Sequence, residues 1–121
     1  MDTQQAFEMA VKHLRKQGCR SQQDATVNGA ITCMYRIPEN GLMCAVGALI
    51  PDEVYQESFE GTAIRGLLRD EPSLNELFRK VNLRLLEDLQ EVHDKCEVEE
   101  WEESLEKLAE FYGLTMPSKG E

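Results

Sequence analysis

A cysteine, a histidine and an aspartate give this sequence the residue types of a nucleophilic catalytic site. Cys44 precedes a short apolar segment, and the free amides and dipole at the start of a helix would favour its thiolate. His93 could take the thiol proton, with Asp94 behind it to orient the imidazole. Such a site is defined by geometry rather than by spacing, so the catalytic group Cys44, His93 and Asp94 is an alternative only. The competing interpretation makes Cys44 a small buried core residue.

Some of the same residues raise the question of a metal site. Strong zinc patterns contain two close pairs of ligands, whereas here only His93 and Cys96 are close in the sequence. A site of three cysteines and one histidine would need four distant side chains to converge. These are Cys33, Cys44, His93 and Cys96. We therefore expect no metal and no cofactor.

Acidic side chains crowd the region after Asp94. Residues 94–110 contain eight aspartates and glutamates, with only Lys95 and Lys107 against them. A solvated helix face is the plain interpretation. The sharper interpretation is a surface that binds a basic protein, because carboxylates on a rigid helix attract the Lys and Arg groups that also bind phosphates. The residues expected in this surface are Glu99, Glu100, Glu102, Glu103 and Glu106.

Residues 33–55, which read CMYRIPENGLMCAVGALIPDEVY, look like a specified structural motif. A Pro-Glu-Asn-Gly turn lies between the Tyr-Arg pair and the apolar run. Arg36 could hold an acid such as Asp52 or Asp94 and so fix the turn over the core. The residues assigned to the motif are Cys33, Tyr35, Arg36, Gly41, Cys44, Gly47, Asp52 and Tyr55.

The composition is typical of one globular domain. The 121 residues are 41% hydrophobic and 30% charged, and a chain of this length can bury a single core. A formal net charge of −10 argues against direct binding of nucleic acid or anionic membrane and favours a basic protein partner. We find neither a secretory signal nor an apolar run long enough for a membrane span, so we expect a cytoplasmic protein with reduced cysteines.

Helical periodicity begins near the start of the chain. Apolar residues recur at helical spacing over residues 3–17, and Gly18 suits the end of that helix. A polar loop is expected over 19–30, and β-branched and aromatic residues favour a short strand over 30–36. The apolar run 42–50 is expected to be a buried helix, stopped by the proline that follows it.

The rest of the chain is predicted to be helical. A short helix is expected over residues 62–68, and an apolar stripe predicts a longer helix over 72–93. The last helix is expected over 98–112, with Gly113 at its end. The fold class is therefore mainly α, a compact bundle of about five helices, with one short β-hairpin or strand pair near residues 27–37. We expect a single domain over 1–114 and a flexible tail over 115–121.

Several short motifs are shared with a known group of proteins. They are CMYR at 33–36, GL at 41–42, CAVGALIPDE at 44–53, Tyr55, EG at 60–61 and LQEVHD at 89–94. In these motifs, and in the order of its elements over about residues 5–114, the chain resembles a family of small uncharacterised phage and prophage proteins. The resemblance implies a phage or prophage origin and carries no established activity. A weaker resemblance, to a bacterial domain family of unknown function, has Asn-Asp in place of His93-Asp94 and implies that a histidine base is not required.

The resemblance and the charge together suggest an anti-defence protein. We expect stoichiometric inhibition or modulation of a basic host or defence-system protein, as by an anti-CRISPR protein, through the acidic face and in the cytoplasm of the host cell. The alternative is a small hydrolase or ligand-binding domain centred on Cys44, His93 and Asp94. A third class is an assembly or regulatory protein that acts as a homodimer.

Overall fold

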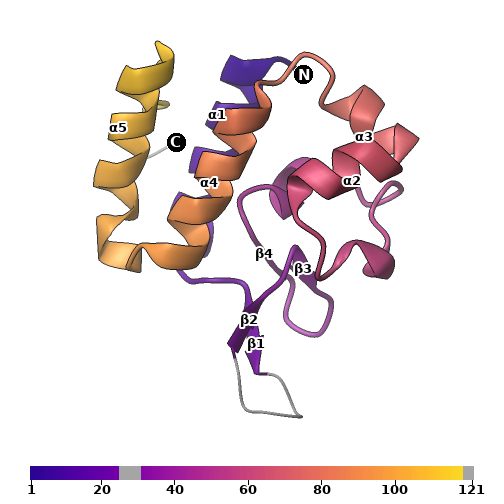
Figure 1. The fold of residues 1–121 in the computed structure, drawn as a ribbon. Helices are drawn as coiled ribbons and strands as arrows, with labels where there is room; N and C mark the ends of the chain where they lie inside the picture. Colours follow the sequence, from indigo (N-terminus) through magenta and orange to yellow (C-terminus); the bar gives the residue numbers. More distant parts are fainter. Residues whose placement is uncertain (25–30, 119–121) are drawn as a thin grey trace.

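Five α-helices dominate the computed structural model, which describes residues 1–24 and 31–118 (Figure 1). This architecture confirms the predicted mainly α fold. The helices are α1 (Thr3–Gln17), α2 (Ile64–Asp70), α3 (Pro72–Leu77), α4 (Leu83–Lys95) and α5 (Trp101–Tyr112). Three 3-10 turns join them, η1 (Gly47–Leu49), η2 (Glu57–Phe59) and η3 (Val98–Glu100).

Helix α1 has the ends that its sequence predicts. The Asp2 carboxylate accepts a hydrogen bond from the Gln5 amide at 2.8 Å, and the Gln5 side chain accepts one from the Asp2 amide at 2.9 Å. This reciprocal pair satisfies donors that the first turn leaves free. At the other end Gly18 has a φ of 65°, which suits glycine, and its amide donates to the Leu14 carbonyl at 2.9 Å.

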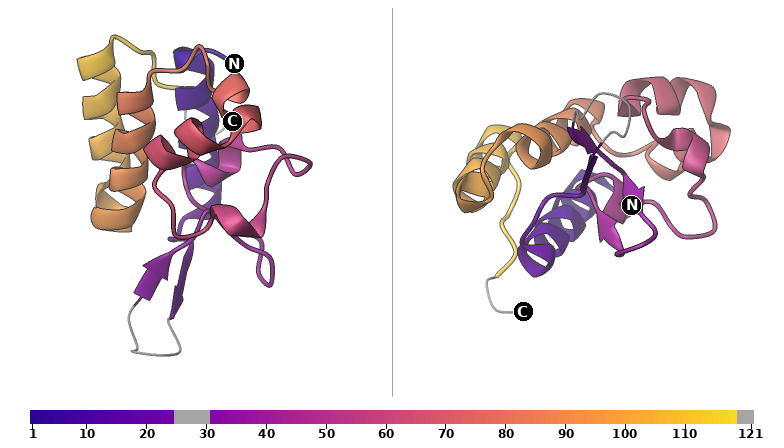
Figure 2. Two further views of the ribbon diagram at one scale, coloured as in Figure 1. Left: turned by 45° about the vertical axis from the view of Figure 1, so that its right-hand side comes forward. Right: turned by 90° about the horizontal axis from the view of Figure 1, so that it is seen from below.

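Helix α4 is the centre of the core. It packs against α1, α2 and α5, and the two views of Figure 2 agree that α5 runs beside it at one side of the molecule. Its apolar stripe is completely or almost completely buried. The buried side chains of α4 are Leu85, Leu86, Leu89, Val92 and His93.

Two short antiparallel strand pairs extend from the helices. β1 (Gln22–Asp24) pairs with β2 (Ile31–Cys33), and β3 (Arg36–Ile37) pairs with β4 (Leu42–Met43). β2 lies inside the strand that we predicted, but its partner β1 precedes the predicted pair. Residues 25–30, on which part of that prediction falls, lie outside the described residues.

The predicted helix over residues 42–50 is wrong. Leu42 and Met43 are extended in β4, and only the short turn η1 follows them. The Gln17 side chain acts on Met43 as a neighbouring strand would, accepting from its amide and donating to its carbonyl, both at 2.9 Å. The carbonyl also lies 2.9 Å from the His13 Nε2 atom. Side chains of α1 therefore hold this segment extended, although its apolar composition led us to predict a buried helix.

The long helix predicted over residues 72–93 is two helices. α3 ends at Leu77 and α4 begins at Leu83. Asn82 caps α4, because its side chain accepts from the Arg84 amide at 2.9 Å and the Leu85 amide at 3.4 Å. The apolar stripe continues through the break in the buried residues Phe78 and Val81, which is why periodicity alone did not reveal it.

Residues after α5 return to α1. The Gln4 side chain donates to the Thr115 carbonyl and accepts from the Thr115 amide, both at 2.9 Å. Arg15 donates to the Pro117 carbonyl at 2.9 Å. The first part of the predicted tail, 115–118, is thus bonded to α1, and residues 119–121 lie outside the described residues.

Candidate functional site

A partly buried carboxylate, Glu60, organises the structural motif of residues 33–55. Its Oε1 atom accepts from the Tyr35 amide at 2.8 Å, and its Oε2 atom accepts from the Arg36 amide at 3.1 Å. The Tyr55 hydroxyl also donates to Oε2, at 2.6 Å. Three donors therefore converge on one side chain, which was not among the candidate site residues.

Arg36 is held at the edge of this motif. Its guanidinium donates to Asp52 at 2.6 Å and to the Ile50 carbonyl, and its carbon atom lies 4.9 Å from the centre of the Tyr55 ring. Of the two predicted partners of Arg36, Asp52 is the one that it contacts. Asp52 is 93% exposed, so the ion pair itself adds little stability. The carbonyl and the ring fix the guanidinium against the protein.

Tyr35, Cys44 and Gly47 form the inner part of the motif. The Tyr35 carbonyl accepts from the Cys44 amide at 3.2 Å, and the Tyr35 hydroxyl donates to the Thr62 carbonyl at 2.5 Å. A Cβ atom at Gly47 would lie 2.0 Å from the Tyr35 oxygen. The absence of a side chain at Gly47 is therefore what allows η1 to pass so close to the Tyr35 backbone. Gly41, with a φ of 74°, turns the chain between β3 and β4.

The Cys44 thiol is a buried group rather than an exposed nucleophile. Cys44 is fully buried, and its sulfur accepts from the Gly47 amide at 3.2 Å. Burial raises the pKa of the thiol, and hydrogen bonds with Gly47 and Gln90 lower it by a smaller amount. The resulting pKa is about 12. The thiol is therefore protonated at neutral pH, and the thiolate is the form that reacts.

His93 has both ring nitrogens engaged. Its Nε2 atom accepts from the Ser21 amide at 2.9 Å, so the proton of the neutral ring is on Nδ1 and is donated to Asp94 at 2.6 Å. The ring is fully buried and stacks on Trp101 at 5.7 Å. His93 thus ties the end of α4 to the segment before β1. Neither nitrogen is available as a base for Cys44, so the geometry does not support the catalytic alternative.

The four candidate zinc ligands do not form a cluster among the described side chains. Cys96 is half-buried and its sulfur accepts from the Ser104 hydroxyl at 3.6 Å. Cys33 ends β2, and its side chain lies outside what the structure describes. Within residues 1–24 and 31–118, we find no group of three His, Cys, Asp or Glu side chains that could hold a metal ion.

Alkylation should distinguish the buried thiol from an exposed one. With iodoacetamide at about pH 8.5 we expect Cys44 to react roughly two orders of magnitude more slowly than the exposed Cys19. The Cys44 rate should keep rising as the pH approaches 12, because its raised pKa keeps the thiol protonated below that value. Peptide mapping by mass spectrometry measures each rate separately. Equal rates at the two residues in the folded protein would show that Cys44 is accessible and ionised.

The acidic residues near α5 do not share one role. Glu102 accepts two hydrogen bonds from Arg15, at 2.9 and 2.6 Å, which ties α5 to α1 and raises the pKa of Arg15. Glu100 accepts from the Glu97 amide at 3.3 Å and so caps η3. Glu103 lies 3.6 Å from Lys107. Glu102 is therefore a structural residue, although the sequence placed it with the binding residues.

The outward side of η3 and α5 remains strongly acidic. Lys107 is the one basic residue in 98–112, and its ion pair with Glu103 is exposed. Phe111 is 79% exposed at the end of the same helix. We call this surface the α5 face and define it by its exposed carboxylates and Phe111. These are Glu99, Glu100, Glu103, Glu106, Glu110 and Phe111.

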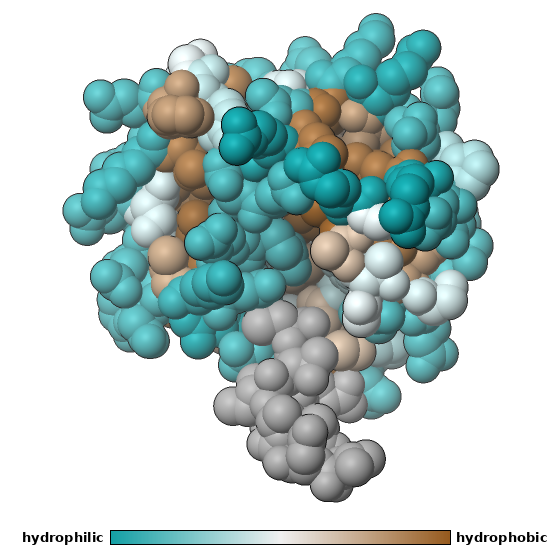
Figure 3. All heavy atoms as spheres, viewed as in Figure 1, coloured by the Kyte–Doolittle hydropathy of each residue, from teal (hydrophilic) through white to brown (hydrophobic). Residues whose placement is uncertain are grey.

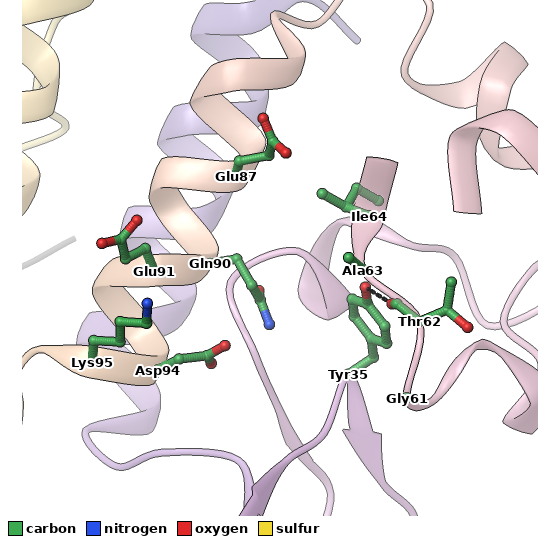
Figure 4. A pocket seen from close by; sticks show the side chains of 10 residues that line it. All are labelled: Tyr35, Gly61, Thr62, Ala63, Ile64, Glu87, Gln90, Glu91, Asp94 and Lys95. Carbon is green, nitrogen blue, oxygen red and sulfur yellow. Dashed lines mark hydrogen bonds between the residues drawn. The ribbon is translucent and has the colours of Figure 1, made fainter. Parts of the chain in front are cut away.

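A cavity of about 320 Å³ opens between α4 and the segment before α2 (Figure 4). Asp94 and Gln90 point from α4 toward Tyr35 on the opposite wall. Neither Cys44 nor His93 lines it, so Asp94 is the one member of the predicted catalytic group that reaches this space. The lining residues are Tyr35, Gly61, Thr62, Ala63, Ile64, Glu87, Gln90, Glu91, Asp94 and Lys95.

Comparison of the chain with protein-family models, with curated proteins and with solved structures finds no match.

Proposed function

We propose that the protein acts by stoichiometric binding to a basic host or defence-system protein, which it inhibits or modulates as an anti-CRISPR protein does. The α5 face is the contact surface. The resemblance to phage and prophage proteins supports the setting, the cytoplasm of a host cell. The net charge of −10 supports the sign of the partner and disfavours direct contact with nucleic acid.

The α5 face is the observation that carries the proposal. Its carboxylates stand on η3 and on α5, a helix that packs on α4 and is bonded to α1 through Arg15 and Glu102, so the backbone that carries them is positioned before binding. Binding to Lys or Arg groups then has to order the Glu side chains but not the backbone. The exposed ring of Phe111 adds an apolar contact of the type that anchors protein interfaces. A homodimer through this face would bring like charges together, which disfavours that arrangement.

The membrane is not part of the proposed setting. None of the helices in the described part of the chain combines the length and the apolar character that a transmembrane segment requires. The acidic surface would also be repelled by anionic lipid headgroups.

Charge reversal on the α5 face should abolish partner capture. We expect the triple variant Glu99→Lys, Glu103→Lys, Glu106→Lys to lose at least about tenfold of the partner captured by tagged protein from host lysate, because the close charge pairs become repulsive. Glu102 is left intact, because its loss would free α5 from Arg15. The captured chain is identified and quantified by mass spectrometry at low and moderate salt.

A matched variant controls for net charge. Glu39, Glu53 and Glu57 are exposed, lie away from α5 in the chain, and can be reversed to Lys with the same change in charge. We expect this variant to keep a stoichiometric basic partner. Equal loss in both variants would show nonspecific electrostatic adhesion, and unchanged capture by the α5 variant would remove the α5 face from the interface. Circular dichroism checks that both variants stay helical.

A further inference from the structure

The cavity beside α4 joins an apolar wall to polar side chains. Tyr35, Ala63 and Ile64 form one side, and Asp94 and Gln90 point from α4 on the other (Figure 4). Figure 3 shows hydrophobic side chains at the surface between α4 and the α2–α3 part of the molecule, bordered by hydrophilic ones. A volume of about 320 Å³ is at the small end of ligand pockets. Such a space suits a short apolar stem with a polar head.

Asp94 is oriented before any ligand arrives. The Ser21 amide donates to the Nε2 atom of His93, and the Nδ1 atom of His93 donates to Oδ1 of Asp94 at 2.6 Å. Because the His93 ring is fully buried, this chain of hydrogen bonds holds the carboxylate in one direction. One carboxylate oxygen is thus used to fix the side chain, and the second has lone pairs for a donor in the cavity.

The charges around the cavity favour a cation. Glu87 is already paired with Arg65 at 2.9 Å, which leaves Glu91 and Asp94 against Lys95 among the lining side chains. The pKa of Cys44 is raised mainly by burial, and the negative charge of Asp94 raises it further. Asp94 therefore acts electrostatically on a buried group behind the cavity. An ammonium or guanidinium head placed near Asp94 would offset this excess of negative charge.

We propose that this cavity binds an alkylammonium or alkylguanidinium group, with the apolar stem against Tyr35 and Ile64 and the cationic head on Asp94. The group belongs either to a small amine or to a Lys or Arg side chain of another protein. The site is separate from the α5 face, so it stands whether or not that face binds a partner.

Titration of the labelled protein with n-butylammonium tests this site by NMR. We expect saturable shifts at roughly millimolar concentration in the amides of residues 61–64 and 90–95. The neutral isostere n-butanol should shift these amides at least about tenfold more weakly, since its hydroxyl can donate to Asp94 but carries no positive charge to form an ion pair with it. Equal shifts from both molecules, or ammonium shifts spread over all acidic surfaces, would overturn the proposal.

Two variants separate Asp94 from general electrostatics. Asp94→Asn removes the charge and keeps an acceptor for His93, and it should weaken butylammonium binding about tenfold. Glu39→Gln, at an exposed position outside both the cavity and the α5 face, removes the same charge and should leave binding unchanged. Unchanged binding in Asp94→Asn would overturn the assignment of the head group to Asp94. If Asp94→Asn does not fold, the comparison with n-butanol on the unaltered protein still decides.

A blocked lysine distinguishes the two sources of the cation. Nα-acetyl-lysine-N-methylamide carries the same butylammonium stem with peptide groups at its other end. If it binds as well as n-butylammonium, the cavity accepts a side chain of a protein. If only the free amine binds, the cavity accepts a small molecule. Either result supports a cation site. If neither ligand binds, the proposal is overturned.

Discussion

The variant Gly47→Ala is expected to lose roughly 3 kcal/mol of stability, with a melting temperature lower by about 10 °C. A Cβ atom at this position would lie 2.0 Å from the carbonyl oxygen and 2.8 Å from the carbonyl carbon of Tyr35. Backbone cannot move aside as the end of a flexible side chain can, because the same carbonyl accepts from the Cys44 amide and the Tyr35 amide is bonded to Glu60. Thermal and urea unfolding measure the loss.

Gly66→Ala is the matched control. Gly66 lies within α2, and the one atom near its added Cβ is the Thr62 methyl group at 3.2 Å, at the end of a side chain. Alanine is favoured over glycine in a helix by roughly 0.5–1 kcal/mol. We therefore expect this variant to be equal to or slightly more stable than the parent. A Gly47→Ala protein as stable as Gly66→Ala would show that η1 does not pass so close to Tyr35.

Glu60→Ala should destabilise the protein by about 3 kcal/mol. The change leaves the amides of Tyr35 and Arg36 and the hydroxyl of Tyr55 without their acceptor. Partly buried donors of this kind are costly to leave unpaired. Urea unfolding gives the free energy, and hydrogen exchange at the amides of residues 35 and 36 reports the same loss locally.

Two further variants show how much of the stability loss in Glu60→Ala comes from its hydrogen bonds. Tyr55→Phe removes one of the three hydrogen bonds and should cost about 1 kcal/mol. Glu53→Ala removes an exposed carboxylate of the same loop region and should change stability by less than about 0.5 kcal/mol. If Glu60→Ala behaves like Glu53→Ala, the carboxylate does not organise the motif.

Local signals predicted the ends of several helices correctly. Gly18 ends α1, and Gly113, with a φ of 68°, ends α5. These signals act over a few residues, so they are legible in the sequence. The break between α3 and α4 was also encoded locally, in the cap Asn82, but the continuous apolar stripe concealed it.

Other features depend on residues far away in the chain. Residues 42–43 are extended because Gln17 bonds both backbone groups of Met43, 26 residues later. Glu102 is structural because it meets Arg15, 87 residues earlier. Periodicity and charge counts describe one segment at a time and do not contain these pairings. For the same reason the sequence could not show that Asp94 lines a cavity while Cys44 is buried in the core.

The contacts of α1 have a consequence for folding on the ribosome. α1 is synthesised before every partner that covers it. Its hydrogen bonds to Lys80, Glu102 and Thr115 span 77, 87 and 111 residues. Part of the apolar face of α1 therefore stays exposed in the nascent chain until α4 and α5 have left the exit tunnel, which is the condition under which chaperones capture hydrophobic segments. Closure of this domain therefore waits until residues as far as Thr115 have been made and have left the tunnel.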